Sequence, residues 1–125
     1  ETAAKYSTER VQFDQPIRKF EGVSFKIADM AVKLEASRLL VLQAARMIDS
    51  GLKATKEAAI AKLHSTETAV DISNEALQVL GGIGYTKEYS VERCLRDARL
   101  MTIGAGTSEI MRYLIQREIY REIRQ

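Results

Sequence analysis

The stretch TKEAAIAKLHSTETAVDISNEALQVL, residues 55–80, decides the fold because it places small and apolar side chains on two faces of one long helix. Residues three or four positions apart lie on the same face of a helix. One such stripe consists of Ala58, Ala61, Ser65, Thr68, Ile72, Ala76 and Val79. A second stripe consists of Ile60, Leu63, Val70 and Leu77. Two apolar faces predict burial on two sides, and the small residues allow neighbouring helices to approach closely.

On the N-terminal side, a second long helix is predicted from Glu21 to Ile48. Its stripe follows the same spacing and consists of Val23, Ile27, Met30, Leu34, Ser37, Val41, Ala44 and Ile48. Gly51 suits a left-handed helix end, and Thr55 is expected to cap the next helix. Before these, the pattern is helical from Thr2 to about Phe13, and the approach to Pro16 ends that segment.

On the C-terminal side, Ser90 is expected to cap a shorter helix that runs through Leu100. A last helix follows from Ser108 to about Ile123, and its charged tail is expected to form a solvated surface: Arg117, Glu118, Arg121, Glu122 and Arg124. No strand pattern or repeat is recognised. The sequence therefore predicts an all-α fold, an up-down antiparallel bundle of the four-helix type, as one domain over residues 1–125 whose first helix is truncated at residue 1.

The composition excludes several classes of function. The 19 Lys and Arg residues nearly balance the 17 Asp and Glu residues, so the charge gives no reason to expect nucleic-acid binding. One cysteine, Cys94, and one histidine, His64, cannot supply a cysteine and histidine metal site, and both are expected to be structural. No apolar run approaches the roughly 20 residues that span a bilayer. Because Glu1 already lies in a helical pattern and no Met precedes it, the chain is expected to be a piece of a longer protein.

Two glycine-bearing loops are candidates for ligand contact. Gly81-Gly82-Ile83-Gly84 follows the long helix, and Gly104-Ala105-Gly106 precedes the last one. The second loop leads into Thr107 and Ser108, whose hydroxyls suit a helix N-terminus, where free N–H groups attract polar or anionic atoms. No strand precedes the first loop, which excludes a dinucleotide-binding fingerprint of the Rossmann type.

Several motifs in order resemble the C-terminal signature of flavin-dependent acyl-CoA dehydrogenases. They are RVQF at 10–13, FKIADM at 25–30, LQVLGGIGYTKEY at 77–89, VER at 91–93, RDAR at 96–99 and IGAGTSEI at 103–110. Together they cover essentially the whole chain. The resemblance implies the helical C-terminal domain of an enzyme that oxidises an acyl-CoA thioester to the trans-2-enoyl-CoA, with FAD as cofactor and electron-transferring flavoprotein as electron acceptor.

The resemblance also implies site residues and assembly. In the family this domain forms the core of a tetramer, and FAD lies across a subunit interface, so a homo-oligomer is expected here, a tetramer or a dimer. Carried over by position, one group would contact the FAD of a neighbouring subunit, and it consists of Arg10, Gln12, Phe13, Gln78, Val79, Leu80, Gly81 and Gly82. A second group at the other end of the domain consists of Thr107, Ser108 and Glu109, with Thr107 as the foremost side-chain ligand. Ala105 and Gly106 would border the acyl-CoA thioester.

Two departures from the family pattern matter. Many members carry Tyr-Glu-Gly-Thr in the second loop, and its Glu is the catalytic base, whereas this chain has Ala105 in that slot and alanine cannot take a proton. This resembles the isovaleryl-CoA and long-chain enzymes, which draw the base from an earlier helix, here before Glu1. The backbone N–H of Ala105 remains a candidate donor to the thioester oxygen. Glu21 replaces a Gln that often contacts FAD, and it is left out of the site.

Three interpretations stay open at this point. The domain is part of a dehydrogenase and inactive alone, or part of an oxidase-type relative, or a non-catalytic helical module that only oligomerises. Low cysteine usage fits the bacterial cytoplasm, which is preferred, or the mitochondrial matrix. The length and branching of the acyl chain do not follow from these residues.

Overall fold

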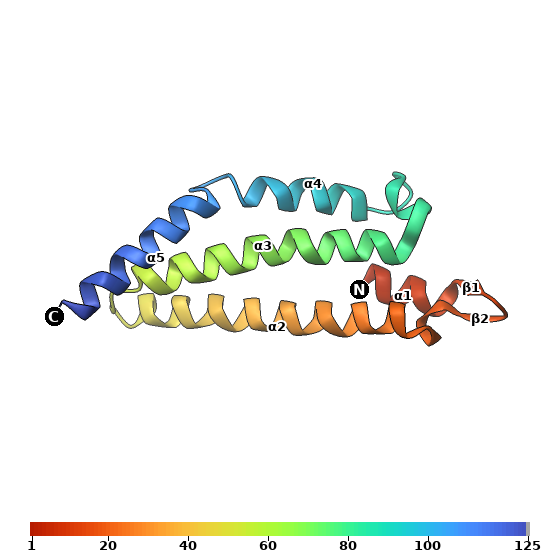
Figure 1. Cartoon of the computed structure of the whole chain (residues 1–125), viewed down its shortest axis with the longest axis horizontal. Helices are drawn as coiled ribbons and strands as arrows, with labels where there is room; N and C mark the ends of the chain where they lie inside the picture. Colours follow the sequence, from red (N-terminus) through yellow and green to blue (C-terminus); the bar gives the residue numbers. More distant parts are fainter. Residues whose placement is uncertain (125) are drawn as a thin grey trace.

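The computed structural model describes residues 1–124 and confirms the all-α fold (Figure 1). Five α-helices make up most of the described chain: α1 (Thr2–Glu9), α2 (Glu21–Asp49), α3 (Thr55–Leu80), α4 (Val91–Met101) and α5 (Ser108–Ile123). Two short 3-10 helices connect them, η1 (Ile17–Lys19) and η2 (Gly81–Tyr85), and a small hairpin pairs β1 (Val11–Gln12) with β2 (Gln15–Pro16).

The helices form layers around α3, which packs against α1, α2, α4 and α5. In Figure 1, α2 runs antiparallel to α3 along one side, while α4 and α5 follow one another along the other side. The short α1 packs at one end, against α2 and α3. This confirms the predicted burial of α3 on two sides, because α2 packs along one side and α4 and α5 along the other.

The apolar core lies where α1, α3 and α4 converge, next to the η2 turn. It consists of Ala3, Val79, Leu80 and Val91, each at most 7% exposed. Around it, Tyr6 and Tyr89 meet edge to face with ring centroids 5.8 Å apart, a favourable aromatic geometry. The core therefore anchors the end of α3 from which the first glycine-bearing loop departs.

The prediction for the first helix is wrong at its end, because α1 stops at Glu9 and a β-hairpin occupies the residues up to Pro16. Gln12 pairs with Gln15, which leaves Phe13 and Asp14 as a two-residue loop with φ angles of 50° and 60°. Positive φ at both loop residues defines the type I′ turn that matches the twist of a hairpin. The sequence does not predict this hairpin, because neither Phe13 nor Asp14 is the glycine that usually signals a two-residue loop.

One predicted helix cap is wrong, because the N-cap of α3 is Ala54 and Thr55 is the first helical residue. Ser90 is the N-cap of α4 as predicted, although its side chain makes no cap bond. The predicted left-handed end at Gly51 is confirmed by its φ of 72°. In the predicted stripe of α2, Ser37 and Ala44 are buried, whereas Leu34, Val41 and Ile48 are exposed in this chain.

The charged tail of α5 is only partly a solvated surface. Glu118 is 4% exposed, and three cations surround its carboxylate: Lys53, Arg117 and Arg121. Arg121 donates at 2.8 Å and Arg117 at 3.1 Å, while Lys53 reaches it from the connection between α2 and α3. These bonds hold the pKa of Glu118 below its ordinary value, the one from Lys53 contributing most.

Candidate functional site

A pocket of about 380 Å³ lies between the hairpin and the C-terminal end of α3. Its lining joins six of the residues predicted to contact FAD, from two segments far apart in the sequence: Arg10, Gln12, Val79, Leu80, Gly81 and Gly82. Tyr6, Ile17 and Ile83 complete it. We call this space the hairpin pocket. The fold thus places the exposed side chain of Arg10 and the exposed backbone of Gly81 and Gly82 in the same pocket.

Local geometry explains how the hairpin pocket forms. Gly81 ends α3 with a φ of 66° that L residues rarely adopt, and its N–H closes the last helical turn on carbonyls of Leu77 and Gln78. The N–H of Ile17 donates to the carbonyl of Arg10 at 2.9 Å, which holds the base of the hairpin. No side-chain or backbone atom lies within 4 Å of the positions where Cβ atoms would stand on Gly81 and Gly82. A ligand can therefore approach this backbone closely.

Two residues predicted for the same site lie outside the lining of the hairpin pocket. Phe13 is 85% exposed at the tip of the hairpin, where its ring meets Phe20 edge to face at 6.1 Å. Gln78 is exposed on the last turn of α3. Within this chain neither side chain belongs to the pocket, and their predicted contact with FAD stays a prediction.

A second, smaller pocket of about 150 Å³ contains the residues predicted at the other end of the domain. Thr107, Ser108 and Glu109 line it together with four residues from α3, α4 and the segment just after α4: Glu67, Arg99, Thr102 and Ile103. We call this space the loop pocket. The 11 residues of α4 span about 16 Å at 1.5 Å per residue, so α4 separates the first glycine-bearing loop from the second.

The loop from Ile103 to Thr107 is tightly folded. Ala105 has a φ of 52° and Gly106 one of 97°, and the N–H of Ser108 closes the loop by donating to the carbonyl of Thr102 at 3.0 Å. Within residues 1–124, the N–H groups of Ala105, Gly106 and Thr107 donate to no acceptor. These free donors beside the start of α5 are suited to a polar or anionic ligand atom.

The polar side chains of the loop pocket have distinct environments. The hydroxyl of Thr107 caps α5 by accepting from the N–H of Ile110 at 3.3 Å, which confirms the predicted helix start. The N–H of Glu109 and the hydroxyl of Thr107 hold the pKa of the Glu109 carboxyl below its ordinary value. The hydroxyl of Ser108 is buried and has no partner among the described residues. A buried hydroxyl without a partner is costly unless a ligand supplies one.

Residues that sequence reasoning missed come from distant parts of the chain. Lys62 on α3 donates to the carbonyls of Met101 and Gly106, which bracket the loop. Arg99 donates to the hydroxyl of Thr102 at 2.8 Å, at the start of the same loop. Lys62 precedes Gly106 by 44 residues. Spacing carries no signal over such a distance, because only the packing of α3 against α4 and α5 brings these groups together.

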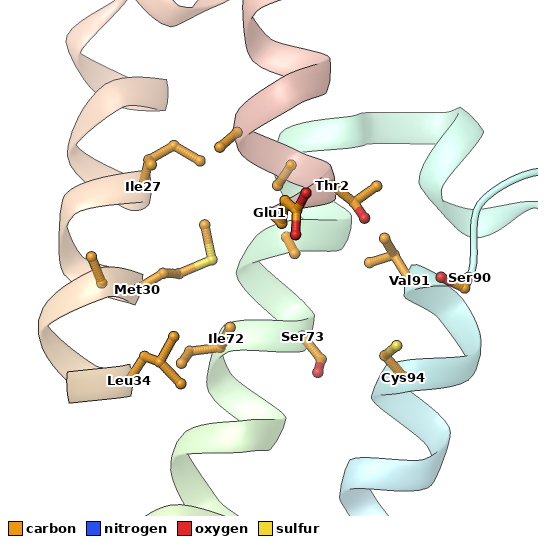
Figure 2. Close-up of a pocket in the computed structure, with 14 residues that line it drawn as sticks. Glu1, Thr2, Ile27, Met30, Leu34, Ile72, Ser73, Ser90, Val91 and Cys94 are labelled. Atoms are coloured by element: carbon orange, nitrogen blue, oxygen red, sulfur yellow. The ribbon is translucent and has the colours of Figure 1, made fainter. Parts of the chain in front are cut away.

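A third pocket, of about 350 Å³, is mostly apolar and lies between α1, α2, α3 and α4. Figure 2 shows Met30 and Leu34 of α2 facing Val91 and Cys94 of α4 across this space, with Glu1 and Thr2 at its end. Its lining carries no basic side chain. It therefore offers no counter-charge for a phosphate-bearing ligand and is distinct from the two pockets above.

The remaining candidates make no site within the described part of the chain. Cys94 is a free, exposed thiol, and the Nε2 atom of His64 is buried without a hydrogen-bond partner among residues 1–124. Groups of His, Cys, Asp and Glu that could hold a metal ion are absent from residues 1–124. In the same residues, no helix is long and apolar enough to cross a membrane.

Two pockets, one with a guanidinium beside bare glycine backbone and one with free N–H donors at a helix start, define a helical domain suited to an extended polar ligand. Residues 1–120 match the family model described as acyl-CoA dehydrogenase, C-terminal domain. The chain belongs to the acyl-CoA dehydrogenase family, of which it forms the C-terminal domain.

Individual relatives agree with this membership. The chain is 52% identical over 116 residues to the probable acyl-CoA dehydrogenase YngJ of Bacillus subtilis, covering 93% of this chain and 30% of the relative. It is 49% identical over 113 residues to the caffeyl-CoA reductase-Etf complex subunit CarC of Acetobacterium woodii, covering 90% and 30%. The structure of butyryl-CoA dehydrogenase from Megasphaera elsdenii superimposes with a TM-score of 0.94 at 41% identity, covering 95% and 31%. The chain thus spans about 30% of the length of these relatives.

Proposed function

We propose that this domain is the FAD-binding and oligomerising part of a flavoenzyme that removes two hydrogens from an acyl-CoA thioester to give the trans-2-enoyl-CoA. The observation that carries the proposal is the hairpin pocket, which joins Arg10 and Gln12 to the glycine turn after α3 in a chain of this family. When bound, FAD would supply a hydride acceptor. The domain alone contains no residue assigned to proton abstraction and is expected to be inactive.

The residues of the hairpin pocket fit a polyphosphate-bearing cofactor. Arg10 presents a planar fork of N–H donors that suits phosphate oxygens. Gly81 and Gly82 leave their backbone uncovered, which allows close approach of the cofactor. Val79 and Leu80 are at most 7% exposed and hold the turn in place. Phe13 and Gln78 do not line this pocket, and they are assigned together with the lining residues to the FAD of a neighbouring subunit.

The loop pocket is assigned to a FAD at the other end of the domain, and the substrate is assigned to Ala105 and Gly106, which precede Thr107 and do not line this pocket. Thr107 is the foremost side-chain ligand in this assignment, and its hydroxyl oxygen also caps α5. Ser108 and Glu109 complete this part of the FAD site. The free N–H of Ala105 would donate to the thioester oxygen, where negative charge develops as the α-proton leaves. Because the side chain of Ala105 cannot accept a proton, the base is assigned to a part of the longer protein before Glu1.

Exposed apolar side chains support assembly into an oligomer. Phe25, Val32 and Leu39 recur every seven residues along α2 and are 60%, 70% and 59% exposed. Residues seven apart lie on one face of a helix, so these three form an apolar strip suited to a second copy of the chain. A tetramer or dimer is therefore part of the proposal. Separately, we propose that the protein is located in the bacterial cytoplasm.

Electron-transferring flavoprotein is the proposed electron partner. One relative at 49% identity is itself named as a subunit of a reductase-Etf complex. The name reductase describes the opposite direction of the same hydrogen transfer, so an assay should run both directions. An oxidase-type relative would instead pass electrons to oxygen, and oxygen consumption distinguishes the two.

The test uses the full-length protein. Purified protein is expected to carry one FAD per subunit, and acyl-CoA thioesters are expected to reduce an added electron acceptor. Arg10→Gln should weaken FAD binding by about tenfold or more, because a charge-assisted hydrogen bond to phosphate is lost. Arg18→Gln is the matched control, since Arg18 is an exposed arginine of η1 outside the pocket lining. Equal FAD affinity in the two variants contradicts the assignment, and a protein without flavin contradicts the function.

A further inference from the structure

Lys62 makes an unusual pair of contacts for a lysine. Its Nζ donates to the carbonyl of Met101 at 2.9 Å and to the carbonyl of Gly106. Lys62 takes part in none of the ion pairs among residues 1–124, whereas Lys53 just before α3 and Lys56 in its first turn pair with carboxylates of α5. The cation of Lys62 therefore serves backbone carbonyls alone.

These two carbonyls stand at the two ends of the loop that precedes α5. Met101 is the last residue of α4, so its carbonyl belongs to the negative end of the helix dipole, where a cation is favourable. Gly106 follows Ala105 directly, and both residues have positive φ angles. Lys62 thus holds the end of α4, through the carbonyl of Met101, and the C-terminal part of the loop, through the carbonyl of Gly106, against α3.

The loop needs such a clamp because its backbone is in a sparsely populated conformation. A left-handed φ raises the free energy of an L residue such as Ala105, and such a conformation persists only where the surrounding structure fixes it. Within the loop, the bond from Ser108 to Thr102 closes its base. Among the described residues, Lys62 supplies the side-chain bond that reaches the segment carrying the free N–H groups.

We propose that Lys62 is a positioning residue, which fixes the loop from Ile103 to Thr107 so that the N–H of Ala105 is aimed at the substrate thioester. This inference rests on the proposed function of the loop and adds a residue to it. Lys62 touches neither cofactor nor substrate in this scheme. It acts through the carbonyl of Gly106, the residue after the donor.

The experiment compares Lys62→Met with Lys62→Arg in the full-length, FAD-loaded protein. Lys62→Met keeps the length of the side chain and removes the cation, whereas Lys62→Arg keeps donors that reach both carbonyls. Exchange of the bonded N–H of Ser108, which closes the loop on the carbonyl of Thr102, is expected to quicken by about tenfold in Lys62→Met, because the loop loses hydrogen bonds from a charged donor. The value of kcat is expected to fall by about tenfold or more while KM changes little, because misplacement of a donor weakens the transition state most. Lys62→Arg should restore most of both.

Lys56→Met is the matched control, because Lys56 lies on the same helix and contacts Glu122 at 2.6 Å instead of the loop. Its loop exchange and kcat are expected to equal those of the unaltered protein. Lys62→Met values equal to those of Lys56→Met overturn the proposal. So does a kcat loss that Lys62→Arg fails to restore.

A second measurement covers the case in which Lys62→Met does not fold. A crystal structure of the unaltered FAD-loaded protein should keep Nζ of Lys62 within about 3.5 Å of both carbonyl oxygens, the reach of a hydrogen bond. A distance beyond that limit from the Gly106 oxygen overturns the proposal. Failure of every acyl-CoA to react would refute the proposed function alone, since loop exchange still reports whether Lys62 fixes the loop.

Discussion

Alanine at Gly84 and alanine at Gly82 should have opposite effects, although the two glycines lie in the same turn. A Cβ on Gly84 would stand 2.7 Å from the Cβ of Leu80 and 3.1 Å from the carbonyl oxygen of Leu77. Neither atom is the end of a flexible side chain, and Leu80 is only 3% exposed, so the turn itself must shift. A Cβ on Gly82 would meet nothing within 4 Å.

The magnitude follows from two opposing effects. Forcing one extra carbon into a packed site costs about 1–3 kcal/mol. Replacing glycine by alanine restricts the unfolded chain and returns about 0.4–1 kcal/mol. Gly84→Ala is therefore expected to destabilise the protein by about 1–2 kcal/mol, whereas Gly82→Ala should be neutral or slightly stabilising. Gly82→Ala should instead weaken FAD binding, because its Cβ would occupy the surface that the cofactor approaches.

The assay is thermal or urea unfolding of the flavin-free protein, followed by titration with FAD. Gly22→Ala is the stability control, because Gly22 lies in the first turn of α2 with nothing within 4 Å of its Cβ position. The reasoning is refuted if Gly84→Ala is as stable as Gly22→Ala. It is also refuted if Gly82→Ala loses as much stability as Gly84→Ala and binds FAD as the unaltered protein does.

Two further predictions concern α5. Thr107→Ala should destabilise the protein by about 1 kcal/mol, because the N–H of Ile110 loses its cap, and Thr107→Ser should keep the stability; urea unfolding measures both. The pKa of Glu118 is held below its ordinary 4.5, mainly by Lys53, so the folded state takes up a proton less readily than the unfolded state. Its contribution is complete above pH 4.5 and is lost as the pH falls through the lowered pKa. Glu118→Gln should therefore be less stable than the unaltered protein at pH 7 and should lose less stability on acidification. The same difference in unfolding free energy between the two proteins at pH 7 and below pH 4 would contradict this.

The long helices could be predicted from the sequence because their signals are local. The predicted segment from Glu21 to Ile48 ends one residue before the observed end of α2, and the predicted start of α5 at Ser108 is confirmed. Gly51 and the loop before Thr107 interrupt apolar patterns that otherwise continue at helical spacing. The family motifs pointed to the residues of the hairpin pocket in both of its sequence segments. Helical spacing alone could not have predicted that Arg10 and Gly82 lie in one pocket.

Features that depend on distant contacts could not be predicted. The hairpin requires positive φ at Phe13 and Asp14, which is uncommon for residues other than glycine and above all for Phe, so the sequence there is read as helix. The burial of Glu118 depends on Lys53, 65 residues earlier, and charged residues in a helix tail are ordinarily exposed. The contacts of Lys62 have the same origin, because they require α3 to lie beside the end of α4.

In the proposed function, the loop before α5 keeps the oxyanion donor but not the base, whereas many relatives are expected to combine the two at one residue. The shape of the loop depends on Lys62, on the bond from Ser108 to Thr102, and on a glycine at position 106, where a Cβ would stand 2.7 Å from Cε of Met111. None of these contacts involves the side chain of Ala105, which is exposed. The backbone N–H can thus keep its direction when another unbranched side chain stands at position 105. A base can then move to another helix without disturbing the donor that stabilises the developing negative charge, because the two groups share no structural support.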